Sequence, residues 1–265
     1  MYRKPAVAGQ FYSSDKNELS RNLKEFLGKI EGQKNVFAVM VPHAGYVYSG
    51  SVAGEVFSKI TIPDTVLLLG PNHTGMGVPL SIMAEGSWET PLGTVDIDTD
   101  LAQELLRNSE VLESDHDAHR REHSLEVEIP FLQMLKSSFR IIPIVIGTQK
   151  EDLLRTLGAE IARNLKGKNV LIVISSDMTH YETHDAAQKK DAFAIRAIEE
   201  LDEGALSKAV STHQISMCGY APAYTALVAV KKLGATEGKL IRYKTSGEVS
   251  GDYDKVVGYA GMVIT

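Results

Sequence analysis

The stretch VMVPHAGYVYSG, Val39–Gly50, begins as an apolar run and then changes character within two residues. The run starts upstream at Val36 and ends at Val41, which is the length and composition of a buried strand. Pro42 and His43 follow at once, and an Ala-Gly pair comes next. A histidine that ends a buried strand in this way is either ordinary loop composition or part of a site. The rest of the sequence has to decide between these interpretations.

Two more apolar runs end on polar residues of the same kind. TVLLLGPNHTG, Thr65–Gly75, passes directly into His73. VLIVISSDMTH, Val170–His180, passes into Asp177, with His180 just beyond. One such ending is unremarkable in a loop, but three in one chain favour a shared cause.

Four apolar runs rich in Val, Ile and Leu predict the strands of one sheet. They are nearly continuous rather than alternating, which is typical of strands covered on both faces in a mostly parallel sheet. Pro143 lies inside one run, and it either weakens the strand assignment or predicts an edge or bulged strand. The last segment, residues 255–265, is a candidate to close the sheet. The four runs are Val36–Val41, Thr65–Gly70, Arg140–Gly147 and Asn169–Ser175.

Helical patterns separate these runs, so the sequence predicts an α/β fold in a single domain, residues 1–265. Asp15 is the expected N-cap of the first helix, and Gly234 the expected C-cap of the last. Phe193, Ile195 and Ile198 are expected to face the core. The helical patterns cover residues 15–30, 100–109, 151–165, 185–202 and 220–234.

Composition excludes several classes of function. The 265 residues are 43% hydrophobic and 23% charged, with a formal net charge of -6, which is ordinary for a globular protein and a poor basis for binding nucleic acid. No apolar stretch is long enough to cross a bilayer, and the first residues lack the apolar segment of a signal peptide. One cysteine excludes an intrachain disulfide. We therefore expect a cytoplasmic protein without nucleic-acid or membrane partners.

The parallel sheet explains the three polar strand ends. In open parallel sheets, ligands bind outside the carboxyl ends of the strands. His43, His73, Asp177 and His180 are therefore expected at one rim, where two neutral imidazoles would make half of a metal site. Cys218 lies at the predicted start of the last helix, which lowers a thiol's pKa. The alternative for Cys218 is a small buried apolar residue.

His119-x-x-Glu122-His123 matches a zinc-peptidase pattern, H-x-x-E-H. That site needs one continuous helix, whereas the acidic residues upstream indicate a loop. We predict that His119 lies on a loop and binds no metal. The alternative is that His123 and Glu126 begin a helix at the rim and support the site from behind.

Other motifs are missing or ambiguous. The sequence has no nucleophile-elbow, P-loop or dinucleotide-binding pattern. Tyr46, Tyr48 and Trp88 are candidates for the wall of a ligand pocket, although aromatic residues at loop edges are also ordinary packing.

Seven blocks in order resemble the Memo family, also called AmmeMemoRadiSam system protein B. They span nearly the whole chain, which makes the match highly specific. The blocks are RKPAVAGQFY, PHAGYVYSG, LGPNHTG, ETPLGTVDID, EHSLEVEIPFLQ, SSDMTHY and CGYAPAYTAL.

The resemblance implies an αβα sandwich around a mixed, mostly parallel sheet, similar to class III extradiol ring-cleaving dioxygenases. It implies a metal pocket formed by His43, His73 and Cys218, with His180 as the acid/base group and Asp177 beside it. We expect Asp177 to orient His180 by a hydrogen bond.

The third metal ligand would be a thiolate where those dioxygenases use a carboxylate. A soft thiolate favours copper or zinc over a harder ion. The resemblance therefore indicates a metal-binding protein, with iron or copper expected and an oxidoreductase activity to be tested. Two alternatives remain open. One is a binding module that takes a small molecule or peptide in the same pocket, and the other is a zinc-dependent hydrolase.

Overall fold

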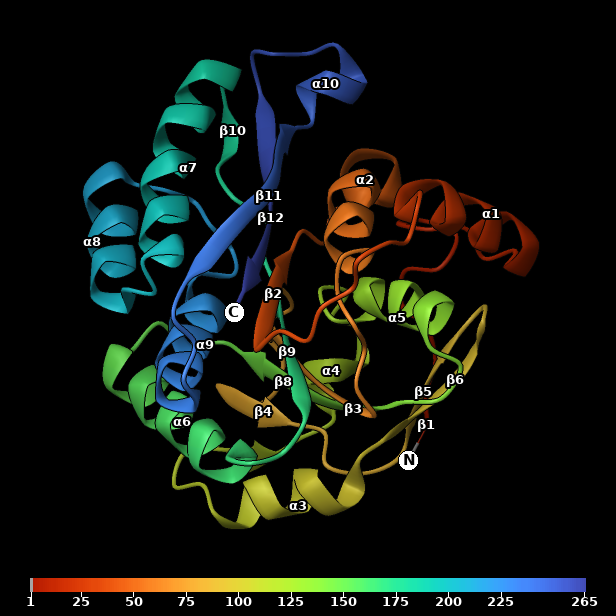
Figure 1. Ribbon diagram of the computed structural model, residues 1–265, viewed down its shortest axis with the longest axis vertical. Helices are drawn as coiled ribbons and strands as arrows, with labels where there is room; N and C mark the ends of the chain where they lie inside the picture. The colour runs from red at the N-terminus through yellow and green to blue at the C-terminus, as the bar shows by residue number, and fades with distance from the viewer. Residues whose placement is uncertain (1) are drawn as a thin grey trace.

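Five parallel strands form the centre of one mixed sheet in the computed structural model, which describes residues 2–265 (Figure 1). Their order across the sheet is β6-β8-β3-β9-β2. β12 continues the sheet beside β2 in antiparallel register and also pairs with β10 and β11. The strands are β1 (Tyr2–Arg3), β2 (Ala38–Val41), β3 (Thr65–Pro71), β4 (Leu80–Ile82), β5 (Ser87–Thr90), β6 (Gly93–Ile97), β7 (Glu113–Ser114), β8 (Arg140–Ile146), β9 (Val170–Ser175), β10 (His180–Glu182), β11 (Gly238–Thr245) and β12 (Val256–Ile264).

Helices cover both faces of this sheet. α1, α2 and α5 form one layer, and α3, α6, α7, α8 and α9 lie on the other side (Figure 1). The helices are α1 (Lys16–Leu27), α2 (Tyr46–Phe57), α3 (Thr99–Arg107), α4 (Asp117–Arg120), α5 (Ile129–Leu135), α6 (Glu151–Leu165), α7 (His184–Glu199), α8 (Glu203–His213), α9 (Tyr220–Leu233) and α10 (Gly247–Ser250), with a 3-10 turn η1 (Glu126–Glu128) before α5. The predicted α/β fold, an αβα sandwich around a mixed sheet, is confirmed.

The strand with the proline lies inside the sheet, not at its edge. β8 is paired along its whole length with β3, and Leu68 stands opposite Pro143. On the other side, β6 pairs with the start of β8 and β4 with its end. Pro143 lies between these two partners, and its carbonyl accepts a hydrogen bond from the Met83 N–H. Proline lacks a backbone N–H, and at Pro143 neither β6 nor β4 pairs with β8. The strand is therefore internal, which corrects the expectation of an edge or bulged strand.

The helix signals were mostly reliable. The Asp15 carboxylate accepts hydrogen bonds from the N–H groups of Asn17 and Glu18, so Asp15 is the N-cap of α1. Gly234 ends α9 with a left-handed φ of 107°, as a C-cap requires. Phe193 was wrongly expected in the core: it is 49% exposed and stacks on His213 at a centroid distance of 3.8 Å.

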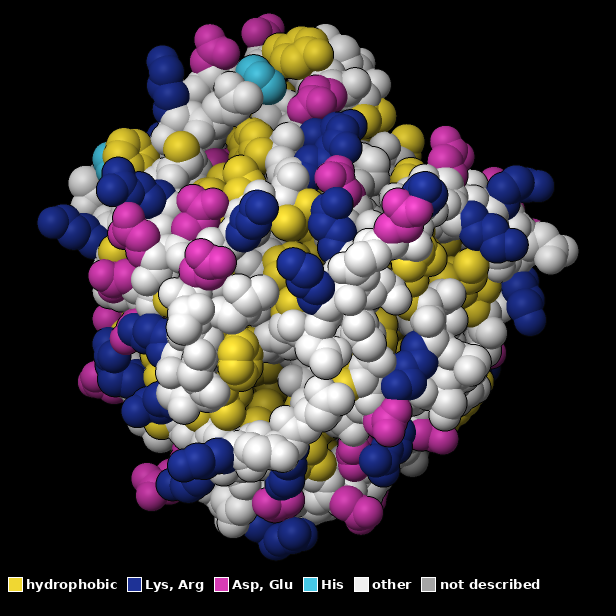
Figure 2. Space-filling view, in the orientation of Figure 1, with side chains coloured by type: hydrophobic (Ala, Val, Ile, Leu, Met, Phe, Trp, Pro, Cys, Tyr) yellow, Lys and Arg dark blue, Asp and Glu magenta, His cyan; other side chains and the backbone are white. Residues whose placement is uncertain are grey.

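The parallel centre brings three strand ends to one rim. The chain leaves β2, β3 and β9 at their carboxyl ends and reaches His43, His73 and Asp177 within two residues of each. No helix in the described part of the chain has the length and hydrophobicity of a transmembrane span. Figure 2 shows cationic and anionic side chains interspersed over one face of the molecule.

Candidate metal site

Two histidines and the cysteine converge at the rim of the sheet. One donor atom from each of His43, His73 and Cys218 lies within 4.8 Å of the others. His43 Nε2 is 3.2 Å from Cys218 Sγ, and the two imidazole rings meet edge to face at 5.1 Å. Donors that share a metal at bond lengths of about 2.0–2.3 Å lie roughly 3–4 Å apart. The residues present therefore fit a metal ion, and the structure brings together the three that the sequence indicated.

A tight loop holds His73 in place. The side-chain oxygen of Asn72 accepts hydrogen bonds from the N–H groups of Thr74 and Gly75, and its amide donates to the carbonyl of Met76. Gly75 has a φ of 65°, a conformation that side-chain-bearing residues rarely adopt. The histidine is thus presented from a turn with its own internal hydrogen bonds.

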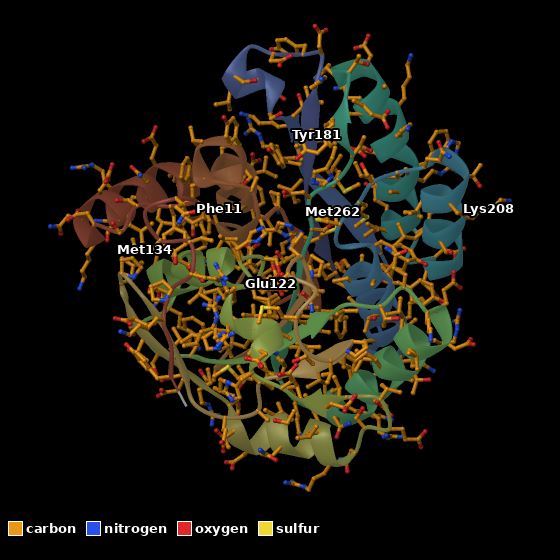
Figure 3. The ribbon with its side chains drawn as sticks, turned by 180° about the vertical axis from the view of Figure 1, so that it is seen from behind. Phe11, Glu122, Met134, Tyr181, Lys208 and Met262 are labelled. Carbon is orange, nitrogen blue, oxygen red and sulfur yellow. The ribbon has the colours of Figure 1, made fainter. Side chains whose placement is uncertain are left out.

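Glu122 fixes the orientation of the His73 ring. Its carboxylate accepts a bond of 2.8 Å from His73 Nδ1 and one of 2.6 Å from the His73 backbone N–H. Burial alone would raise the pKa of this carboxyl, but the contacts with His73 and the Ser124 N–H lower the pKa to about 2. Glu122 is fully buried, and Figure 3 shows it near the centre of the molecule. A carboxylate on Nδ1–H leaves the Nε2 lone pair free, which is the usual support for a metal-bound histidine.

His43 is supported differently. Its backbone N–H donates to Asp177 Oδ1 at 2.8 Å, and its Nδ1 lies 2.8 Å from Ser175 Oγ. The ring is only 2% exposed. Burial, and then the nearby charges of His73 and His123, hold the pKa of His43 well below its usual range. The neutral imidazole is therefore the stable form, as metal binding requires.

The thiol of Cys218 does not have the lowered pKa that its position at a helix start predicts. It lies just before the N-cap of α9, Gly219, and the Asp177 N–H points at its sulfur at 3.2 Å. Burial nevertheless raises the pKa of the thiol, and the carboxylate of Asp177 raises it further. The helix start alone is thus too weak to give a thiolate, and a bound cation would have to supply the missing stabilisation.

Asp177 and His180 do not form the expected pair. His180 contacts Ser216 instead: the Ser216 hydroxyl accepts a hydrogen bond from the His180 N–H at 2.8 Å, and the Ser216 carbonyl lies 2.9 Å from Nδ1. Asp177 instead holds the backbone of His43, and burial raises the pKa of its carboxyl to about 7. The expected hydrogen bond from Asp177 to His180 is therefore corrected: the backbone carbonyl of Ser216 orients the ring and leaves Nε2 free.

His123 lies beside the site. Its ring is 4.6 Å from that of His73 and 5.4 Å from that of His43, and its Nδ1 is 3.4 Å from a Glu122 oxygen. His73, Glu122 and His123 form a second group of possible donors. Because the Glu122 carboxylate already accepts hydrogen bonds from the N–H groups of His73 and Ser124, the set of His43, His73 and Cys218 is the better candidate for metal ligands.

The H-x-x-E-H pattern is not a helical zinc site. α4 ends at Arg120, so His119 and His123 do not share one helix. His119 was expected on a loop but lies within α4, fully buried, with Nε2 3.0 Å from Ser81 Oγ. Glu126 begins the turn η1, and its carboxylate accepts a hydrogen bond of 2.8 Å from Arg3 Nη1.

The aromatic candidates separate into core and rim. Tyr46 is 5% exposed, and its ring packs 4.9 Å from Phe131. Trp88 was wrongly expected at the rim: it is fully buried, and its indole N–H points at the sulfur of Met83. Tyr48 is 38% exposed in the first turn of α2, shortly after His43 in the sequence.

A further phenol faces the same space. Tyr259 lies on β12 and is 2% exposed. Burial raises the pKa of Tyr259, and the charges of Asp177, Tyr48 and Tyr181 raise it further. Tyr181 is 76% exposed and sits at a register shift in β10 with a φ of 61°. Figure 3 shows Tyr181 above Glu122 in that view.

Sequence reasoning missed several of these groups. Glu122 was noted only as part of a zinc-peptidase pattern, and Ser175, Ser216 and Tyr259 were not singled out as site residues. Ser175 had a usable signal, because it ends the apolar run just before Ser176 and Asp177. Tyr259 had none, since it lies in the middle of an apolar strand.

Comparison with known proteins identifies the family. The family model described as "Memo-like protein" matches residues 3–263. The chain is 44% identical over 264 residues to a MEMO1 family protein of Aquifex aeolicus, which covers 98% of each chain. It is 43% identical over 281 residues to MEMO1 family protein MK0963 of Methanopyrus kandleri, which covers 99% of each chain.

The fold also resembles that of a solved structure. The crystal structure of uncharacterized protein JW3007 from Escherichia coli K12 matches with a TM-score of 0.57 at 12% identity, over 85% of this chain and 98% of that one. This similarity supports the fold. The family match and the identities carry the assignment, and the chain belongs to the Memo family.

Proposed function

We propose that this Memo-family chain is a metal-dependent oxidoreductase that holds iron or copper through His43, His73 and Cys218. The observation that carries the proposal is the convergence of one donor atom from each residue within 4.8 Å. Both histidines have a polar partner on Nδ1 that leaves Nε2 available. Such support of the far ring nitrogen is what a metal site needs and a purely structural histidine does not.

The donor set suits a redox metal. A thiolate is a soft ligand, and two imidazoles suit iron, copper and zinc alike. When bound, the metal would supply electron transfer and open coordination positions for a ligand. Three protein donors leave such positions free, as in catalytic rather than structural sites.

The surrounding residues supply proton handling and ligand contacts. His180 has its Nδ1 against the Ser216 carbonyl, so its Nε2 can accept or return a proton at the rim. The phenol of Tyr259, which lies near enough to Asp177 for that charge to raise its pKa, would donate a hydrogen bond to an oxygen atom of a bound ligand. Tyr48 would add an apolar wall.

A second candidate function is a non-catalytic module that binds a small molecule or peptide in the same place. The exposed rings of Tyr48 and Tyr181 favour it, because exposed aromatic side chains commonly bind partners. A zinc-dependent hydrolase is a third candidate, since two histidines, a cysteine and a water also describe catalytic zinc.

Metal content separates these candidates. We would purify the protein without oxygen or chelators and measure its elements, together with those of His43→Ala and His73→Ala. The matched control is His119→Ala, which removes a buried histidine outside the group of donors. About one equivalent of iron or copper, lost in the first two variants and kept in the control, supports the proposal. Zinc favours hydrolysis, no metal favours the binding module, and loss of metal only in the His119 variant contradicts the site.

A further inference from the structure

Glu128 is a buried carboxyl group directly behind the metal site. It closes the turn η1 and is fully buried. Its Oε1 is 2.9 Å from Ser175 Oγ, and its Oε2 has no hydrogen-bond partner in the described part of the chain. An ionised carboxylate with a bare oxygen in such a place would be costly.

Ser175 contacts three polar groups at once. Its Oγ is 2.7 Å from the Ser124 carbonyl, 2.8 Å from His43 Nδ1 and 2.9 Å from Glu128 Oε1. A serine hydroxyl has one proton to donate and can accept two hydrogen bonds. The Ser124 carbonyl can only accept, so the hydroxyl proton points to Ser124.

The other two contacts must then be donated to Ser175. His43 donates from Nδ1–H, and Glu128 donates from a protonated Oε1. Every contact is satisfied in this arrangement, and the bare Oε2 is the carbonyl oxygen of a neutral acid. An ionised Glu128 would draw the single Ser175 proton away and leave two oxygens 2.7 Å apart at Ser124 without a proton between them.

We propose that Glu128 is a neutral carboxylic acid that acts as a positioning residue: it donates to Ser175 and so holds the serine that orients His43. Burial is the main reason that the pKa of Glu128 lies well above its usual range, and the charge of Asp177 raises it further. The protonation of Glu128 does not depend on the proposed function, whereas its consequence for metal binding rests on that function.

The two histidines of the site are therefore not equivalent. His73 donates to the anionic Glu122, whereas His43 donates to a neutral chain of hydroxyl and carboxylic acid. An anionic partner makes an imidazole a stronger donor to a metal. With Glu128 neutral, the negative charges around the proposed ion are those of the Cys218 thiolate, Glu122 and Asp177.

The protonation can be tested without any metal. We would record infrared spectra of the metal-free wild type and Glu128→Gln at about pH 9, above the ordinary range of carboxyl pKa values. The wild type should show the carbonyl band of a protonated carboxylic acid, and Glu128→Gln should lose it. The matched control, Glu160→Gln, changes a buried glutamate on α6 that accepts from the Glu110 N–H, and should keep the band. A band that persists in Glu128→Gln, or is absent from wild type, overturns the proposal.

Metal affinity tests the positioning role. Glutamine can still donate to Ser175 through its amide, so Glu128→Gln should bind Zn²⁺ within about twofold of wild type. Glu128→Leu removes the donor and should bind about tenfold more weakly. Equal weakening in both variants would show that the charge of Glu128, not its donated hydrogen bond, matters. If wild type binds no Zn²⁺, the metal site fails while the infrared result still decides the protonation.

Discussion

The contact between Glu122 and His73 gives the sharpest prediction from the geometry. The carboxylate accepts three N–H bonds: from His73 Nδ1 at 2.8 Å, from the His73 backbone at 2.6 Å and from the Ser124 backbone at 2.9 Å. Glu122→Gln replaces one acceptor oxygen by an NH₂ group of the same size. At least one N–H donor then faces another donor inside the protein.

The magnitude follows from these contacts. A buried N–H left without an acceptor costs about 1–3 kcal/mol of folding free energy. Loss of the group that orients a metal-bound histidine typically weakens metal binding by about 10–100-fold, or about 1.4–2.8 kcal/mol. Glu122→Gln should therefore stay folded but bind metal in this range more weakly than wild type.

The assay is an anaerobic titration in which a coloured chelator competes for the metal, paired with urea unfolding of the same samples. Glu160→Gln is the control for removing a buried carboxylate elsewhere, and its metal affinity should match wild type. Unchanged affinity in Glu122→Gln would show that the carboxylate does not act through His73, and would refute this account of the support.

Three other outcomes are expected. Cys218→Ser should weaken Cu(I) binding far more than Fe(II) binding, measured by anaerobic competition, because thiolate is the soft ligand of the set; unchanged Cu(I) affinity would remove the sulfur from the site. Tyr181→Gly should be more stable to urea than Tyr181→Ala by about 1 kcal/mol, because only glycine relieves the positive φ; the reverse order would contradict the strained backbone. Burial lowers the pKa of His119 to about 3, below its value in the unfolded chain. The stability that neutral His119 contributes is therefore fully present above about pH 6.5 and is lost as the pH falls toward 3. As the pH is lowered, the free energy of unfolding should therefore fall more steeply in wild type than in His119→Gln, by up to about 1.4 kcal/mol per pH unit. Parallel plots of unfolding free energy against pH for the two proteins would contradict this prediction.

The sheet could be predicted because its signal is local. Runs of Val, Ile and Leu mark strands covered on both faces, and β2, β3, β8 and β9 follow those runs closely. α2 was not predicted, because YVYSGSVAGEVF contains two glycines and two serines, which let the helix pack closely but give no helical stripe of apolar residues. Gly54 is an example, because a Cβ there would collide with the backbone of Phe26.

The site could be predicted only in part. Parallel topology brings strand ends together, so His43 and His73 could be placed at one rim from the sequence. The partners that orient them could not be deduced, because Glu122 and Glu128 come from a loop and a turn whose path depends on tertiary packing. The thiol of Cys218 shows the same limit: a helix start is visible in a sequence, but the burial that outweighs it is not.

The central claim is that the sulfur of Cys218 and two imidazoles bind one metal ion. X-ray absorption spectroscopy at the edge of the metal in anaerobically purified protein tests it most directly. We predict one sulfur scatterer and two imidazole groups in wild type. The chain has one cysteine, so Cys218→Ser should lose the thiolate scatterer and keep both imidazoles. A wild-type spectrum without sulfur, or a thiolate signal that persists in Cys218→Ser, would contradict the account.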